Sequence, residues 1–176
     1  MSHWNETYDA LAGCYDDMTE DVNYPGWADF LEKLFSRGKH PVHSVLDLAC
    51  GTGTMSFLLA ARGYELIGVD FSPEMLAIAA EKTLEGEGEP PIFLCQPMEK
   101  LDLYGTVDAC VCLLDSVNHI TQPGKLRRAF ERVRLFLEPG GLFVFDVHTP
   151  EHLAGLDGGI SVSYTHLRAH ETPEHL

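Results

Sequence analysis

The chain has 176 residues, of which 45% are hydrophobic and 22% charged, a composition typical of one globular domain. Its formal net charge of −15 disfavours nucleic-acid substrates, because an acidic surface repels phosphate backbones. No apolar run reaches the roughly 18 residues of a membrane span, and the N-terminus lacks the layout of a signal peptide, so we expect a cytoplasmic protein without a membrane partner.

Residues 1–40 carry a helical pattern that is rich in aromatic side chains. Apolar residues recur at helical intervals after Pro25, and proline is favoured in the first turn of a helix because its missing N–H would be unpaired there anyway. The pattern therefore predicts a helix in the second half of this segment.

From residue 44 onward, short apolar runs alternate with amphipathic stretches. Strands are predicted at 44–49, 65–70, 91–95, 107–113 and 142–147, and helices at about 53–62, 73–84 and 123–137. Because the apolar runs lack polar alternation, we expect the strands to be buried on both faces. Successive β-α units of this size predict an α/β fold with a doubly wound, mainly parallel sheet.

Local signals refine this pattern. Ser72 is placed to cap a helix whose first residue is Pro73, and the Glu-Pro-Gly-Gly run at 138–141 predicts a turn before the last strand. Alternation puts Cys110 and Cys112 on one face of the fourth strand, where they would act as small buried hydrophobic residues. The five cysteines lack the paired spacing of a zinc site, so we expect no metal.

A glycine-rich loop follows the first predicted strand. Gly51 and Gly53 lie between that strand and a helix, where glycine lets a ligand approach the main chain closely. Asp70 ends the next strand, 19 residues after Gly51, and an acid at that place accepts hydrogen bonds from both ribose hydroxyls. Together these residues predict a nucleoside-binding site.

The charge of the ligand follows from two departures from G-x-G-x-x-G, the glycine motif of dinucleotide-binding proteins. Ser56 stands where the third glycine would fall, and the first strand carries an acid, Asp47, close to the loop. A carboxylate repels a pyrophosphate but attracts a sulfonium that also bears an α-ammonium group. A cationic nucleoside is therefore favoured over NAD, although an NAD-dependent oxidoreductase stays open as an alternative.

At these residues the sequence resembles the class I S-adenosylmethionine-dependent methyltransferases. The family's acid-x-Gly-x-Gly-x-Gly motif corresponds to Asp47–Gly53, with Ala49 at the first glycine. The resemblance implies S-adenosylmethionine as cofactor, with Asp70 on the ribose diol and Phe71 and Met75 against the adenine. It also implies that the methionine and ribose moieties are lined by Asp47, Ala49, Cys50, Gly51 and Gly53.

The resemblance extends to later loops and to the N-terminus. Gln96 and Met98 match the end of the third strand, where Pro97 replaces the acid that often reads the adenine amino group in the family. The loop after the fourth strand implies that Leu114, Asp115, Ser116 and Asn118 border the methyl donor and the acceptor. Residues 1–40 resemble a helical lid, for which Tyr15, Tyr24 and Trp27 are candidates to close over the ligand; packing into the core is the alternative for these aromatic residues.

The implied reaction is an in-line displacement at a methyl group, so the main task of the enzyme is alignment of the reacting atoms. A general base is optional, and His119, Asp115 and His148 are candidates because they follow strands at their carboxyl ends. We expect a methyltransferase acting on a small-molecule acceptor, with no obligate protein partner. A non-catalytic module that only binds S-adenosylmethionine is a further alternative.

The C-terminal region departs from this pattern. The family sheet has seven strands and only five are predicted here, so we expect the core at 41–160 to be truncated after its fifth strand and prone to aggregation through an unpaired edge. Residues 161–176 resemble the translated read-through of a sequencing adapter, which predicts a non-native tail.

Overall fold

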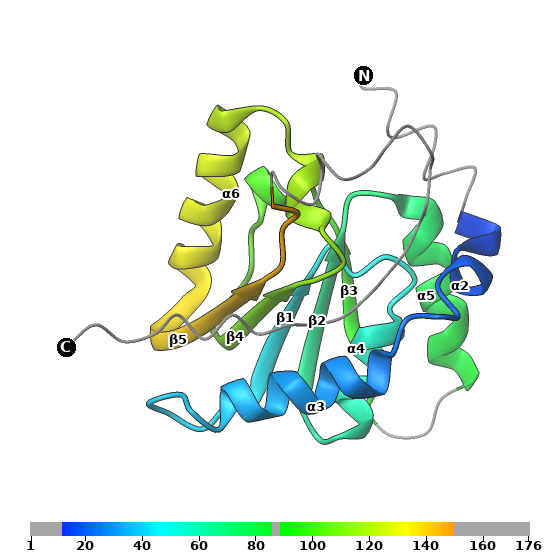
Figure 1. The fold of residues 1–176 in the computed structure, drawn as a ribbon, viewed down its shortest axis with the longest axis horizontal. Coiled ribbons are helices and arrows are strands. Elements are labelled where there is room, and N and C mark those ends of the chain that lie inside the picture. The colour runs from blue at the N-terminus through cyan, green and yellow to red at the C-terminus, as the bar shows by residue number, and fades with distance from the viewer. Residues whose placement is uncertain (1–11, 86–88, 150–176) are drawn as a thin grey trace.

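The computed structural model describes residues 12–85 and 89–149, which form a parallel sheet flanked by helices (Figure 1). The strands are β1 (Ser44–Leu48), β2 (Glu65–Asp70), β3 (Ile92–Cys95), β4 (Val107–Cys112) and β5 (Leu137–Phe145). They pair in parallel in the order β3-β2-β1-β4-β5, and their arrows point the same way in Figure 1. The predicted doubly wound parallel sheet is confirmed.

The helices are α2 (Tyr15–Met18), α3 (Tyr24–Phe35), α4 (Thr54–Ala61), α5 (Pro73–Glu85) and α6 (Pro123–Phe136), with short 3₁₀ turns η1 (Ala12–Cys14), η2 (Met98–Lys100) and η3 (Ser116–His119). The three helices predicted with bounds, α4, α5 and α6, lie within one residue of those bounds, and α3 lies in the second half of residues 1–40 as predicted. Ser72 caps α5 as expected, because its hydroxyl accepts a hydrogen bond from the Met75 N–H at 3.2 Å. Within the described part of the chain, no helix is long and apolar enough to span a bilayer.

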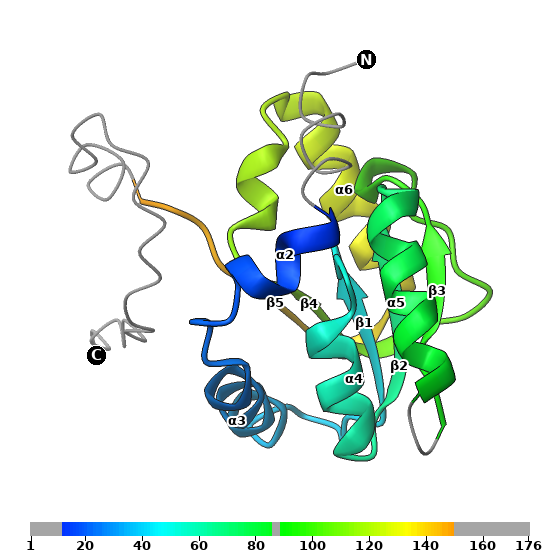
Figure 2. The same cartoon turned by 90° about the vertical axis from the view of Figure 1, so that its right-hand side faces the viewer.

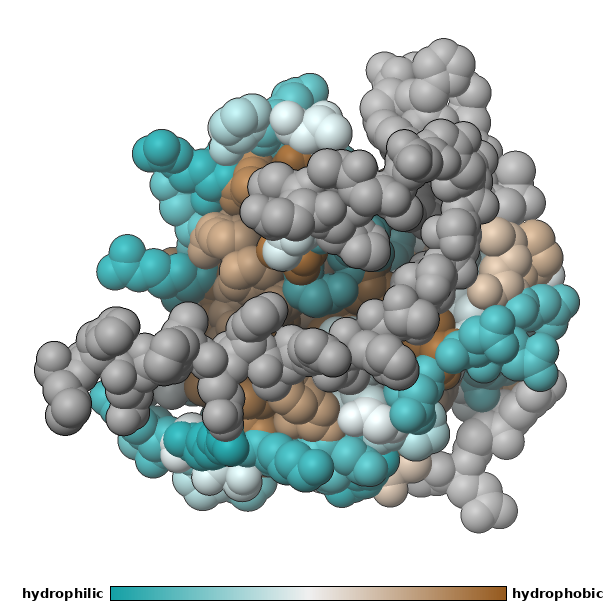
Figure 3. Space-filling model, viewed as in Figure 1, coloured by the Kyte–Doolittle hydropathy of each residue, from teal (hydrophilic) through white to brown (hydrophobic). Residues whose placement is uncertain are grey.

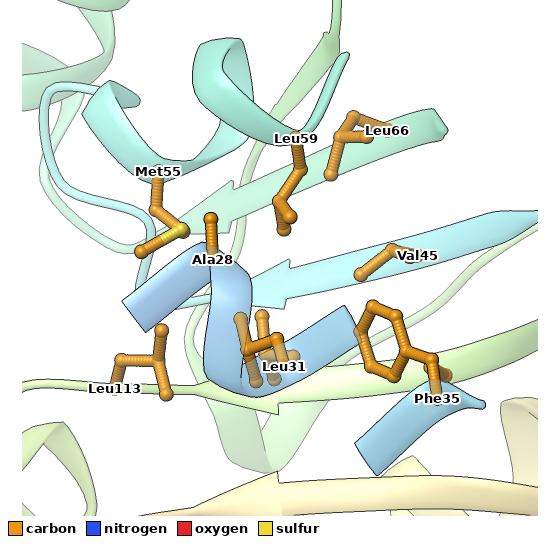
Figure 4. Packing of buried hydrophobic residues seen from close by; sticks show 10 residues of the cluster. Ala28, Leu31, Phe35, Val45, Met55, Leu59, Leu66 and Leu113 are labelled. Carbon is orange, nitrogen blue, oxygen red and sulfur yellow. The ribbon is translucent and has the colours of Figure 1, made fainter. Parts of the chain in front are cut away.

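One face of the sheet is covered by α3 and α4. Figure 4 shows the Phe35 ring of α3 next to Val45 of β1, and Leu31 of α3 packs in the same cluster with Met55 and Leu59 of α4. Ion pairs tie the two helices together at the surface, and Figure 2 shows them side by side. The N-terminal helix α3 is thus part of the hydrophobic core of the sheet.

The opposite face is covered by α6. Val133 and Phe136 of this helix pack with Cys110 and Cys112 of β4 in a second buried cluster, which confirms that these two thiols lie on one buried face. Hydrophilic residues cover the outward faces of α3 and α6, and hydrophobic residues show between the two helices (Figure 3). Because connections between parallel strands are right-handed, the reversal of direction after β3 moves the covering helix to the other face.

The predicted turn at residues 138–141 is wrong in one respect, because these residues lie inside β5. Leu137 pairs with Val107 and Leu142 with Ala109, so four residues of β5 stand opposite a single residue of β4. Gly140 takes a φ of +92°, and the segment forms an irregular bulge in an edge strand of the described sheet, where a proline without an N–H is tolerated. The strand also ends at Phe145 instead of residue 147.

Three parts of the predicted organisation lie outside the described residues. These are the part of the N-terminal lid before residue 12, the end of the core at 150–160 and the tail at 161–176.

Candidate functional site

The glycine loop lies at the carboxyl end of β1 and holds three residues at positive φ. These are Ala49 at 65°, Gly51 at 55° and Gly53 at 79°. The N–H groups of Ala49 and Cys50 both donate to the carbonyl of Val69, at 2.7 and 3.1 Å, and so fix the loop to β2. A non-glycine residue rarely adopts this backbone region, so the strain at Ala49 is held in place by these bonds.

Asp70 closes the site from the end of β2. One carboxylate oxygen accepts from the Gly51 N–H and the other from the Ser72 N–H, each at 2.9 Å. The backbone N–H of Phe71 also bonds to Asp70, and because a carboxylate has about four acceptor positions, acceptor capacity is left for a ligand hydroxyl. Burial raises the pKa of Asp70, and the bonds from backbone N–H groups oppose that shift. Its geometry fits recognition of a ribose.

Asp47 is a second acid at the site and is only 3% exposed. Its Oδ2 accepts a 2.6 Å hydrogen bond from the hydroxyl of Ser56, the residue that stands where a third glycine would fall. Burial raises the pKa of Asp47 to about 6 against this bond, and the charge of Asp70 adds to the shift. A positive ligand group beside Asp47 would relieve the cost of burying its charge.

Two adjoining cavities open at this edge of the sheet. The large cavity, of about 490 Å³, has the size of a typical small-molecule site. It is lined by Tyr15, Ala49, Gly51, Asp70, Phe71, Met75, Pro97, Met98, Glu99, Lys100, Leu114, Ser116, His119, Ile120, Thr121, Gln122 and Lys125. The small cavity, of about 30 Å³, lies beside Asp47 and Cys50 and is walled by Tyr15, Tyr24 and Trp27 among others. A nucleoside with a short cationic branch could occupy both.

Most of the predicted site residues meet at these cavities. The large cavity takes Asp70, Phe71, Met75, Met98 and His119, the small cavity takes Asp47, Cys50 and Trp27, and both take Tyr15, Ala49, Gly51 and Leu114. Tyr24 and Trp27 also pack against the core cluster under α3. The two interpretations of these aromatic residues, ligand cover and core packing, are therefore compatible.

Five predicted residues, Gly53, Gln96, Asp115, Asn118 and His148, do not line either of the cavities that the described residues form. Gly53 caps α4 under the ring of Phe93. The Gln96 amide is engaged by the backbone of Asp102, with bonds of 3.1 and 2.8 Å, and Asn118 is exposed to solvent. The Asp115 carboxylate pairs with the Nε2 atom of His148 at 2.7 Å.

The Asp115–His148 pair lies at the carboxyl ends of β4 and β5. The N–H of Asp115 donates to Asp146 at 2.9 Å, and burial raises the pKa of Asp146, with a further rise from Asp115. Asp115 itself has a φ of 50°, and this bond from its N–H supports the strained conformation. Asp146 was not predicted from sequence, because nothing local in the chain distinguishes it from a surface acid that follows a strand.

A polar cluster beside the glycine loop was also missed. Asp16 of α2 bonds to Thr52 and Thr54, and Lys82 of α5 joins all three. Glu99 and Lys125 form another ion pair, at 3.1 Å, in the wall of the large cavity. Contacts between residues 16, 52 and 82 leave no periodic signal, so only the folded structure reveals them.

Comparison with known proteins gives a consistent result. The model of a family described as a methyltransferase domain matches residues 45–141. A Bacillus subtilis (strain 168) protein named as a methyltransferase is 35% identical over 149 residues, which cover 84% of this chain and 58% of that protein. This chain thus spans less than two thirds of the relative.

Solved structures agree with this match. The crystal structure of an S-adenosylmethionine-dependent methyltransferase from Clostridium acetobutylicum superposes with a TM-score of 0.74 at 33% identity, covering 85% of this chain and 61% of that one. A sugar N-methyltransferase from a Streptoalloteichus species gives a TM-score of 0.68 at 27% identity, covering 78% and 55%.

Proposed function

The chain belongs to the class I S-adenosylmethionine-dependent methyltransferases, and on this premise we propose that it transfers a methyl group from S-adenosylmethionine to a small-molecule acceptor. The observation that carries the proposal is the pairing of Asp70 with the glycine loop at the mouth of the large cavity. The family match gives no support to the alternative of an NAD-dependent oxidoreductase.

In this proposal, the residues around both cavities bind and orient the donor. Asp70 accepts hydrogen bonds from the ribose, and Phe71 and Met75 pack against the adenine. Asp47 faces the cationic end of the donor, close to Tyr15 and Trp27. When bound, S-adenosylmethionine supplies a methyl group that is already activated by a positive sulfur, so these residues need only hold it in line.

The acceptor side of the proposal rests on β4 and β5. His119 lines the large cavity and is placed to take a proton from an acceptor there, whereas Asp115 would act together with His148. The net charge of −15 and the similarity to a sugar N-methyltransferase support a small molecule over a nucleic acid. The five free cysteines support a reducing compartment such as the cytoplasm.

The proposed organisation has two parts. Of the described residues, those from 41 onward form the donor-binding core, and residues 12–40 form a helical lid against it. Support for the lid comes from Tyr15 and Trp27, which belong to the N-terminal part and line the cavities of the core.

Isothermal titration with S-adenosylhomocysteine tests the donor site. We expect the wild-type chain to bind, and Asp70→Ala to weaken binding by about 100-fold, because two hydrogen bonds to a charged group are lost. Asp29→Asn is the matched control. Asp29 is an exposed residue of α3 that forms an ion pair with Arg62, and loss of this ion pair should leave binding unchanged. Equal affinity of wild type and Asp70→Ala would refute the ribose assignment, and tighter binding of NAD would refute the donor.

A further inference from the structure

The four-residue helix α2 lies over the donor site without burying any of its own described side chains. Figure 2 shows α2 just above the first turn of α4. Tyr15, its first residue, lines both cavities, and its Cε1 atom lies 3.7 Å from the place where a Cβ on Gly51 would stand. So short a helix is unstable alone, and apolar burial of α2 does not account for its position.

Polar contacts of Asp16 hold α2 in this position. Its Oδ1 accepts from the hydroxyl of Thr52 at 2.6 Å and from that of Thr54 at 3.3 Å, and its Oδ2 pairs with the ammonium of Lys82 at 2.6 Å. Partial burial would raise the pKa of Asp16, but the bonds from Lys82 and Thr52 outweigh it and lower the pKa. The carboxylate is thus charged and held at both oxygens at neutral pH.

Lys82 connects the same contacts to a third element. Its ammonium also donates to the Thr52 carbonyl at 3.2 Å and to the Thr54 hydroxyl at 3.3 Å. Thr52 belongs to the glycine loop and Thr54 begins α4, whereas Lys82 stands on the last turn of α5. The Lys82 ammonium therefore binds both the glycine loop, through Thr52, and the helix α2, through Asp16.

We propose that Asp16 and Lys82 form an ionic clasp that positions Tyr15 over the donor site and slows release of the bound donor. The inference rests on the proposed function for the identity of the ligand. Asp16 and Lys82 line neither cavity, so they act through Tyr15 as positioning residues. Release requires α2 to separate from the loop, and that separation breaks the ion pair.

Dissociation of S-adenosylhomocysteine, followed by stopped-flow tryptophan fluorescence, measures the clasp. We expect Asp16→Asn and Lys82→Met each to speed dissociation by about 5-fold, and the double variant to match either single variant, because both remove one interaction. Lys82→Arg, which keeps the charge, should restore most of the slow release. Added salt should speed release from wild type and leave Lys82→Met nearly unaffected, because the side chains of the pair are partly exposed.

A second background separates positioning from general stability. In the Tyr15→Ala background, Asp16→Asn should change the dissociation rate by less than about 1.5-fold, since the residue through which it acts is gone. Asp29→Asn, which breaks a surface ion pair on α3, is the matched control and should leave the rate unchanged. Unaltered release in both Asp16→Asn and Lys82→Met would overturn the clasp.

Hydrogen exchange in the ligand-free protein makes the test independent of the ligand. The N–H of Thr19 bonds to the carbonyl of Tyr15 at 3.0 Å, so its exchange reports on α2. We expect faster exchange in Asp16→Asn and Lys82→Met than in Asp29→Asn, and equal rates would overturn the clasp. If wild type failed to bind S-adenosylhomocysteine, the proposed function would fall, while exchange would still decide whether the clasp holds α2.

Discussion

At the scale of single residues, the structure pairs a function with a cost at Asp47. The carboxylate is buried at the end of β1 and receives one hydrogen bond from a side chain, that of Ser56. Its pKa is raised to about 6 by burial, so the folded protein holds a proton there more tightly than the unfolded chain does. The acid for which we propose contact with a cationic ligand thus destabilises the ligand-free fold at neutral pH.

Asp47→Asn should stabilise the ligand-free protein at pH 7.5. Because the folded pKa is raised from 3.8 to about 6, the stability of wild type is fully present below pH 4 and falls as pH rises through 6. The loss is on the order of 2–3 kcal/mol and the asparagine avoids it. Thermal denaturation should show a higher midpoint for the variant at pH 7.5 and equal midpoints near pH 4.

The same substitution should weaken binding of S-adenosylmethionine by about 10-fold, since the negative charge is gone. Asp29→Asn, at an exposed carboxylate, is the control for the thermal denaturation and should not raise the midpoint at pH 7.5 relative to pH 4. A variant less stable than wild type at pH 7.5 would contradict the account of Asp47.

Sequence reasoning reaches some of the site residues and not others for a physical reason. Asp47, Gly51 and Asp70 lie at strand ends, which periodicity locates, and parallel strands bring their carboxyl ends together. Gln96 also follows the end of a strand, yet its amide forms hydrogen bonds with the Asp102 backbone and does not line the cavity. Asp16 is 36 residues from Thr52 in sequence, and a contact over that distance has no local signature.

At the scale of elements, the Phe93 ring of β3 packs over Gly68 of the neighbouring strand β2, where the glycine has no side chain. A Cβ on Gly68 would lie 2.6 Å from the Phe93 ring and 3.0 Å from the Cys50 sulfur, and a Cβ on Gly53 would lie 2.8 Å from the same ring. Phe57 of α4 packs on Phe93 with ring centroids 5.6 Å apart. The Phe93 ring thus fills the space above Gly53 and Gly68 and lies beside the glycine loop.

Gly68→Ala should destabilise the protein by about 2 kcal/mol, because the added methyl group overlaps a ring that α4 holds in place. Urea denaturation measures the loss. Phe93→Leu removes the overlapping ring edge, so in that background the alanine should cost less than about 1 kcal/mol. Additive losses in the double variant would show that the steric account is wrong.

The elements themselves were largely predictable, with two informative exceptions. The mostly buried strands β1, β2 and β4 read as apolar runs, and α5 begins at the predicted Ser72-Pro73 cap. The expectation of burial on both faces is wrong for β3 and β5, which are partly exposed because they lie at the two edges of the described sheet. Residues 138–141 carry a turn signature and do bend the chain, but as a bulge within β5. Turn propensity reports the local backbone angles, such as the positive φ of Gly140, and is silent on whether the neighbouring strand continues to pair.

At the scale of the molecule, apolar side chains are exposed at the edge formed by β5 and α6. Phe130, Phe143 and Phe145 form a ring cluster with centroids 5.0 to 5.3 Å apart, and Phe145 is 41% exposed. Leu135 and Val147 are about half exposed. Apolar side chains gathered along an edge strand favour association with other surfaces.

The 176-residue chain should therefore self-associate as its concentration rises. Light scattering after size exclusion should show a growing apparent mass for wild type and a smaller increase for Phe145→Lys, which adds a charge to the edge. Tyr104→Lys is the matched control, because Tyr104 is fully exposed and stands apart from this cluster. A wild-type chain that stays monomeric at every concentration would contradict the prediction.

The reversal of strand order between β1 and β4 also divides the molecule for the protein engineer. The proposed donor contacts of the β1-β2-β3 half come from one stretch of about 60 residues, whereas His119, Asp115 and His148 follow β4 and β5. Random libraries confined to these three positions would leave the β1-β2-β3 half untouched, and also Leu114 and Ser116, which line both cavities. A new acceptor could thus be sought while S-adenosylhomocysteine affinity serves as a constant check on folding.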